Sequence, residues 1–419
     1  MKGDAAAIIA GAGPAGLFLA ARLAGGLGAR LAGELTEPVV LLEAGPKSGR
    51  KLLASGSGQC NITHAGAIAD FPDRYGRPAA GRFLKRALYA FSNADLEAWF
   101  LERGLAFEAE GGGKIFPSTR RASDVLGILL AECSSRGVDL RLGSRARSAR
   151  PIEGGFELEL EGGGLLRAPR IALATGGMSY PLTGSTGDGY RIAAALGHRI
   201  VDPKPALSPV LVADFALGEL AGIGFEDLPF VARRPGAKPI SARGDFLITH
   251  EGFSGPGILD ASRFLSPGDR LEPDFSGLGY EAFREAFLRR AAASPRSFVR
   301  TALAESGLPR RMAELFCSFA SVGEEETCAS LRREKRETLL RSATAYPAEI
   351  RALGGFDKAM VTAGGVSLDE VDPGTMESRI APGLFFAGEI LDYDGDSGGY
   401  NLQAAFSTAY AAARAMASS

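Results

Sequence analysis

The sequence predicts an α/β protein built around a parallel β-sheet, and three stretches of the chain support this prediction. A short apolar run at residues 5–10 is followed by closely spaced glycines and then by an apolar pattern of helical period. A second apolar run at 39–42 ends on an acidic residue, and a strand–turn–helix pattern fills residues 383–417. Short apolar strands that alternate with helices are typical of a parallel sheet with helices on both faces.

The glycines of the first stretch, Gly11, Gly13 and Gly16, have the spacing G-x-G-x-x-G. In that pattern the first glycine permits a tight turn, the second lets the backbone approach a pyrophosphate, and the third lets the helix lie close to the strand. Glu43, which ends the second strand, would accept hydrogen bonds from a ribose hydroxyl and repel a 2′-phosphate. The stretch therefore predicts a dinucleotide site that disfavours NADP. We interpret the long connection at 25–33 as a surface insertion.

Composition limits the class of protein. A chain of 419 residues is long enough for two or three domains, and its net charge of −2 favours neither nucleic acid nor an anionic membrane. Its four cysteines form no C-x-x-C pair, which indicates a reducing compartment and predicts neither a disulfide framework nor a metal site. We expect a cytoplasmic protein with a small-molecule substrate and no nucleic-acid or membrane partner. The sequence leaves the oligomeric state open.

Further along the chain, residues 44–64 form a loop rich in glycine and serine that carries Arg50 and Lys51. Its backbone donors and cations suit a polyanion or a flat polar ring, and the alternative is a solvated loop. Residues 80–105 have a helical pattern whose aromatic stripe predicts core packing. A β-hairpin is predicted around the turn at 162–164, and a buried strand at 171–174 leads into a second tight turn.

Near the C-terminus, a strand at 383–387 leads into Glu389, a polar loop and a helix over 402–417. The N–H groups at that helix start can face the N1–C2=O edge of an isoalloxazine ring, and Glu389 can accept hydrogen bonds from ribitol hydroxyls. The alternative is a strand–helix pair that only completes the sheet. The order of these segments resembles that of FAD-binding proteins with two dinucleotide folds.

Several blocks of the sequence resemble one family, the BaiN-like, aminoacetone-oxidase-family FAD-binding enzymes. The blocks lie at 49–63, 174–189, 249–256, 362–366 with 375–378, 388–392 and 398–401. Gln59 stands where the family has arginine, and His64 stands where asparagine is common. The resemblance implies a Rossmann-like FAD domain (1–195 and 354–419), an inserted β-rich domain (196–275 and 343–353) and a helical subdomain (276–342).

The motifs and the resemblance together predict the residues that bind FAD. They are Gly11, Gly13, Pro14, Ala15, Gly16, Glu43, Ala44, Arg50, Lys51, Ser55, Gly56, Gly58, Cys60, Asn61, Thr175, Gly176, Gly388, Glu389, Asp392, Gly399, Tyr400 and Asn401.

For catalysis, His250 is a candidate acid or base and Tyr180 a candidate phenolic donor, and for each the alternative is a structural role. Cys60 has no neighbouring cysteine, so we interpret it as a packed or flavin-adjacent thiol rather than a redox-active one. No second G-x-G-x-x-G follows a strand, so either NAD(P)H docks only transiently as an electron donor, or electrons pass elsewhere, for instance to oxygen. The leading hypothesis is an FAD-dependent oxidoreductase, either a reductase or an amine-type oxidase.

Two other hypotheses remain. One is a flavin-bound sensor or interaction protein without rapid turnover. The other is a flavin-dependent RNA-modifying enzyme, which the near-neutral charge disfavours. We interpret the mixed-charge run at 332–336 as a solvated helix face.

Overall fold

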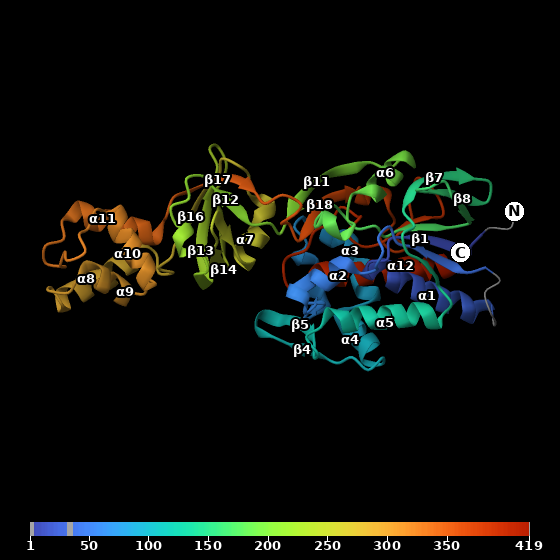
Figure 1. Cartoon of the computed structure of the whole chain (residues 1–419), viewed down its shortest axis with the longest axis horizontal. Coiled ribbons are helices and arrows are strands. Elements are labelled where there is room, and N and C mark those ends of the chain that lie inside the picture. The colour runs from blue at the N-terminus through green and yellow to red at the C-terminus, as the bar shows by residue number, and fades with distance from the viewer. Residues whose placement is uncertain (1–3, 32–36, 419) are drawn as a thin grey trace. The chain divides into compact units, whose positions relative to one another are not determined.

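The computed structural model describes residues 4–31 and 37–418, and it divides the chain into two compact units (Figure 1). The first unit runs to Ala206 and resumes at Phe356, and the second spans Leu207–Gly355. Each unit encloses an apolar core of its own.

A five-stranded parallel sheet forms the centre of the first unit, in the order β19–β10–β1–β2–β6. All residues of β1, β2, β10 and β19 are buried, because helices cover a sheet whose strands are apolar on both faces. The fold class predicted from the sequence is confirmed. The strands are β1 (Ala7–Ala10), β2 (Val39–Leu42), β6 (Asp139–Arg141), β10 (Ile171–Leu173) and β19 (Leu384–Phe386).

Three long helices accompany this sheet: α1 (Pro14–Leu31), α5 (Ala122–Ser135) and α12 (Tyr400–Ser418), with α1 packed against the other two. The surface insertion predicted at 25–33 is wrong for residues 25–31, because α1 continues to Leu31. Residues 32–36 lie outside the described part of the chain. Gly25 belongs to the helix where Arg136 approaches closely, since a β-carbon at Gly25 would lie 2.1 Å from the Arg136 Nη1 atom.

The predicted helix at 80–105 is two helices, α3 (Pro78–Ala90) and α4 (Asn93–Leu101). Ser92 separates them with a capping box, in which its side chain accepts from the Asp95 N–H and the Asp95 carboxylate accepts from the Ser92 N–H. The predicted hairpin is present and gains a third strand. The other elements of this unit are α2 (Arg50–Ala54), β3 (Thr63–His64), β4 (Phe107–Ala109), β5 (Lys114–Pro117), β7 (Ala146–Ile152), β8 (Gly155–Leu160), β9 (Leu165–Ala168), α6 (Asp188–Ala195), β11 (Ile200–Ala206) and β18 (Val361–Val366).

The second unit is a closed six-stranded barrel joined to a group of helices. Its core is continuous, because Phe230 and Phe246 of the barrel belong to the same buried cluster as Phe283 and Phe316 of the helices. The barrel strands are β12 (Val210–Val212), β13 (Gly224–Arg233), β14 (Ile240–Ile248), β15 (Gly252–Ser254), β16 (Arg270–Pro273) and β17 (Ala348–Leu353). The helices are α7 (Pro256–Ala261), α8 (Tyr280–Ala293), α9 (Val299–Glu305), α10 (Arg310–Phe319) and α11 (Arg333–Thr344).

The division of the chain differs from the predicted boundaries in two respects. The boundary predicted after residue 195 assigned β11 to the inserted domain, whereas β11 pairs with β18 in the first unit. The β-rich and helical segments, predicted as separate parts, lie in one unit because they share a core.

Candidate cofactor and active site

The glycine turn between β1 and α1 has the geometry that its spacing predicts. Gly11 has a φ of 104°, and a β-carbon there would lie 2.4 Å from the Ala174 carbonyl oxygen. A β-carbon on Gly16 would lie 1.8 Å from the Gly11 carbonyl oxygen, whereas one on Gly13 would meet no described atom within 4 Å. The first and third glycines therefore allow close packing, and the second leaves open space beside the helix start. Pro14 and Ala15 form the first turn of α1.

Glu43 lies directly after β2 and is held against this turn. Its two carboxylate oxygens accept from the Ala12 N–H at 3.1 Å and from the Gly45 N–H at 2.8 Å. Ala44 is the residue between Glu43 and Gly45 in the sequence. The acidic side chain thus stands at the carboxyl end of the sheet, where ligands of such folds bind.

The glycine–serine loop is compact. Residues 50–54 form α2, and Ser55–Gly58 form a short 3₁₀ turn in which Gly56 and Gly58 have positive φ. Cys60 also has positive φ and is fully buried, and burial raises the pKa of its thiol to about 12 despite a hydrogen bond with Ser55. The Cys60 thiol is therefore protonated at neutral pH, and a thiol in that form is a poor nucleophile.

Four segments that are distant in sequence meet in a polar cluster formed by Lys51, Ser179, Thr362 and Glu389. The Lys51 ammonium lies 2.7 and 2.9 Å from the two carboxylate oxygens of Glu389 and also donates to the Ser179 hydroxyl. The same carboxylate accepts from the Ser179 hydroxyl at 3.0 Å and from the Thr362 N–H at 2.8 Å. The Lys51 and Glu389 side chains are 25% and 19% exposed, so this ion pair is only partly screened by water.

Sequence reasoning placed Lys51 and Glu389 in the site but missed Ser179 and Thr362. Both missed residues lie inside blocks that carry the family resemblance, so the signal was present. The Thr362 hydroxyl accepts from the Met178 and Ser179 N–H groups at 2.8 and 3.1 Å, and this fixes the loop after β10 to β18.

The C-terminal segment closes the same edge of the sheet. Gly388 has positive φ, and its N–H donates to the Thr408 hydroxyl of α12 at 3.0 Å. A β-carbon on Gly399 would lie 2.3 Å from the Thr63 carbonyl oxygen, so the chain at the start of α12 approaches β3 closely. The Tyr400 ring stacks on the His64 ring at 4.9 Å.

Two predicted binding residues of this segment have structural partners. Asn401 closes the loop before α12. Its side-chain oxygen accepts from the Gly395 N–H at 2.8 Å, and its side-chain nitrogen donates to the Gly395 carbonyl at 2.9 Å. Asp392 is buried and forms an ion pair with Arg77, a residue that sequence reasoning missed. The ion pair and the hydrogen bond from Arg77 to the Asp392 carbonyl join the chain before α3 to the C-terminal loop.

The two candidate catalytic residues belong to different units. Tyr180 of the first unit follows Ser179 and has a φ of 53°, which is unusual for a tyrosine. Its N–H donates to the Phe356 carbonyl at 2.8 Å, and its carbonyl accepts from the Thr183 N–H at 2.8 Å. His250 is exposed and belongs to the second unit.

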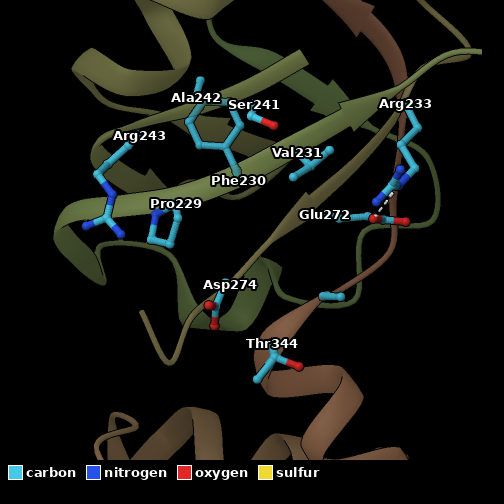
Figure 2. A pocket seen from close by; sticks show the side chains of 11 residues that line it. Pro229, Phe230, Val231, Arg233, Ser241, Ala242, Arg243, Glu272, Asp274 and Thr344 are labelled. Atoms are coloured by element: carbon cyan, nitrogen blue, oxygen red, sulfur yellow. Dashed lines mark hydrogen bonds and ion pairs between the residues drawn. The ribbon is translucent and has the colours of Figure 1, made fainter. Parts of the chain in front are cut away.

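A cavity of about 560 Å³ lies in the second unit, beside β13, β14 and β16 (Figure 2). Its charged lining is already paired: Arg233 contacts Glu272 at 2.8 Å, Arg243 contacts Asp227 at 2.8 Å, and Asp274 accepts from the Gly279 N–H at 2.7 Å. None of the predicted site residues lines this cavity.

The described residues contain no group of three or more His, Cys, Asp or Glu side chains placed to hold a metal ion. Within the same residues, no helix is both long and apolar enough to cross a membrane.

The fold and the glycine turn define a dinucleotide-binding protein of Rossmann type. The HI0933-like protein Rossmann domain matches residues 5–415. The chain belongs to this family, which confirms the resemblance, and it is an FAD-dependent oxidoreductase.

Two characterised relatives match nearly the whole chain. It is 32% identical over 418 residues to the ribosomal RNA dihydrouridine synthase of Escherichia coli strain K12, and the match covers 97% of each protein. It is 31% identical over 388 residues to the 3-dehydro-bile acid delta(4,6)-reductase of Clostridium scindens, covering 90% of this chain and 92% of the relative.

The fold is also similar to a solved structure, the 3-ketosteroid-delta4-(5alpha)-dehydrogenase of Rhodococcus jostii RHA1. The TM-score is 0.50, the identity is 16%, and the match covers 100% of this chain and 98% of the other. At that identity the similarity concerns the fold alone.

The residues of the first unit fit an FAD molecule. Gly13 faces open space at the start of α1, as a pyrophosphate requires. Among the described residues, the buried Asn61 Oδ1 and Thr175 Oγ1 atoms have no hydrogen-bond partner, although buried polar atoms are normally paired. Polar groups of a bound cofactor would supply such partners.

Proposed function

We propose that this flavoenzyme reduces a carbon–carbon double bond conjugated with a carbonyl group. The observation that carries the proposal is that two relatives with nearly full coverage are named for this one type of reaction. Dihydrouridine is uridine reduced at the ring double bond next to a carbonyl, and a 3-dehydro delta(4,6) bile acid carries double bonds conjugated with its 3-ketone. We propose a uracil ring in RNA as the first substrate to test and a 3-oxo steroid as the second.

The chain's own residues would hold the cofactor and the substrate. A flavin bound there would supply hydride transfer from a donor to an electron-poor carbon. The turn at Gly11–Gly16 would hold the pyrophosphate, and Glu43 would accept from a ribose hydroxyl. Glu389 would accept from the ribitol chain, and Lys51 would balance its negative charge. We propose NAD(P)H as the donor, docked transiently.

Hydride addition leaves the neighbouring carbon in need of a proton, and we propose Tyr180 as its source. Tyr180 follows Ser179 of the polar cluster, and its backbone is held at positive φ by bonds to Phe356 and Thr183. Strained residues that are held by their surroundings gather at active sites. Tyr180→Phe should lower kcat roughly a hundredfold or more, the lower range for a lost general acid, and leave the FAD content unchanged.

The test follows the flavin absorbance of the purified protein under anaerobic conditions. NADH or NADPH should bleach it, and a 4-en-3-one steroid or a uridine-containing RNA should restore it and gain two hydrogens by mass spectrometry. The same protein stripped of flavin is the control. Flavin that small amines bleach and neither nicotinamide reduces would contradict the proposal and identify an oxidase.

A further inference from the structure

The helical segment at 276–342 differs in charge from the rest of the chain. It contains eleven arginines and one lysine against nine glutamates, a net charge of +3. Because the whole chain carries −2, the remainder carries −5. The near-neutral total therefore conceals a local positive surface, and conclusions about partners drawn from the total do not apply to this segment.

The backbone brings five of these arginines to one end of the helical part. The Val299 N–H donates to the Glu326 carbonyl at 3.0 Å, and the Cys328 N–H donates to the Ser297 carbonyl at 3.0 Å. These bonds hold the segment at 295–299 alongside residues 326–329, directly before α11 begins. We call the five residues the arginine cluster: Arg296, Arg300, Arg332, Arg333 and Arg336.

The cluster differs from other arginines of the same helices in its pairing. Arg284, Arg290, Arg310 and Arg341 each form an ion pair with a glutamate. Within the described part of the chain, no ion pair involves a member of the arginine cluster. The nearby acids include Glu326, which is paired with Lys335 at 2.7 Å, and the exposed Glu324, Glu325 and Glu334. Five arginines outnumber these three remaining carboxylates, so the surface stays positive.

An exposed aromatic side chain lies within the cluster. Phe298 is 39% exposed, and the Arg300 guanidinium lies over its ring at 5.1 Å. Guanidinium groups bind phosphates in a bidentate manner, and an exposed ring or a guanidinium plane stacks on unpaired bases. Arginine with an exposed aromatic side chain is a combination typical of RNA-binding surfaces.

We propose that the arginine cluster binds the phosphate backbone of a structured ribosomal RNA. This inference rests on the proposed function, with a uracil ring as the base that is reduced. The Escherichia coli relative, which is 32% identical and matches 97% of this chain, is a ribosomal RNA dihydrouridine synthase. A single uracil offers few groups for recognition, so contacts to the surrounding phosphates would supply most of the affinity.

The test measures binding of the flavin-loaded full chain to transcribed fragments of Escherichia coli ribosomal RNA by fluorescence anisotropy at several KCl concentrations. The variant carries Arg296→Ala, Arg332→Ala and Arg333→Ala. We expect its affinity to fall roughly tenfold or more at low salt, and the slope of log K against log salt to fall by about two to three.

A matched control removes the same charge elsewhere in the second unit, with Arg243→Ala, Arg284→Ala and Arg310→Ala. Each of these arginines pairs with an exposed carboxylate that offsets its charge, so their loss should change RNA affinity less than roughly threefold, as for charges that contact no phosphate. Flavin content and circular dichroism verify the folding of both variants.

Equal RNA affinity of the two variants would overturn the inference, as would no RNA binding by the wild-type protein at low salt. Reduction of a 4-en-3-one steroid by a protein that binds no RNA would overturn the inference and leave the proposed function standing. RNA binding that depends on the cluster, in a protein that reduces neither substrate, would support the inference and contradict the proposed function.

Discussion

The candidate functional features of the two units are built in different ways. In the first unit the candidate site is built mainly from backbone geometry, since Gly11, Gly16 and Gly399 each occupy positions where a β-carbon would meet a backbone atom. In the second unit the feature most suited to a partner is a set of arginine side chains on a helical surface. Backbone constraints leave motifs of fixed spacing in a sequence, whereas a surface of like charges leaves only a local bias in composition.

The largest expected effect tests the backbone constraints of the first unit. In Gly16→Ala the new β-carbon would lie 1.8 Å from the Gly11 carbonyl oxygen, and neither backbone can move without breaking the β1–α1 turn. We expect no soluble protein that carries flavin. Gly13→Ala is the matched control, because the space beside Gly13 is open, and it should fold normally and lose only FAD affinity. Flavin content and circular dichroism distinguish the two, and a Gly16→Ala protein with normal flavin content would contradict the prediction.

The next effect concerns the separate core of the second unit. Phe316 is fully buried and its ring lies 6.2 Å from the rings of Phe275 and Tyr346. Phe316→Ala should destabilise this unit by about 3–5 kcal/mol, as other large-to-small core substitutions do. Urea unfolding followed by circular dichroism should shift, while flavin release from the first unit should not. Phe319→Ala, at a ring that is 37% exposed, is the milder control. Flavin release that shifts together with the circular dichroism would show that the two units unfold as one.

The polar cluster of the first unit should give a smaller effect. Lys51→Met leaves the partly buried Glu389 carboxylate without its cation, whereas Lys51→Met with Glu389→Gln removes both charges. We expect the double variant to be more stable than the sum of the single effects by about 1–3 kcal/mol. Urea unfolding of the four flavin-loaded proteins completes the double-mutant cycle, and strictly additive effects would show that this ion pair contributes nothing.

The sequence predicted those parts of the fold that depend on spacing. The strands at 5–10 and 39–42, the glycine turn and Glu43 after β2 follow from local patterns, and the structure has them at those positions. The sequence did not predict that α1 continues to Leu31, because glycines at 25 and 26 suggest a loop. The close approach of the Arg136 side chain, which explains a glycine at position 25 of the helix, is visible only in the structure.

The missed site residues share a physical cause. Ser179 and Thr362 act through bonds to Glu389, and Arg77 through an ion pair with Asp392, and each partner is more than 25 positions away in sequence. Spacing rules describe neighbours on one element, so they give no information on pairs that only the tertiary fold brings together.

The smallest expected effect is a pH dependence of the second unit. Asp269 is buried and accepts from the Arg234 Nε atom at 2.7 Å and from the Ser266 N–H at 2.8 Å. The hydrogen bond from Arg234 is the main reason that the pKa of the Asp269 carboxyl lies below its usual range. Because the folded-state pKa is lowered, this stabilisation is complete above the unfolded pKa of about 3.9 and is lost as the pH falls through the folded value.

We therefore expect the melting temperature of the second unit to fall by roughly a few degrees between about pH 5 and about pH 3, and to fall less in Asp269→Asn. Calorimetry of both proteins measures this difference. Asp245→Asn is a suitable control. Within the described residues, the Asp245 carboxylate accepts one hydrogen bond, from the Asp227 N–H at 3.2 Å, and it forms no ion pair with a cation. An Asp269→Asn protein that loses as much stability on acidification as the wild type would show that the acid sensitivity of this unit comes from other carboxylates.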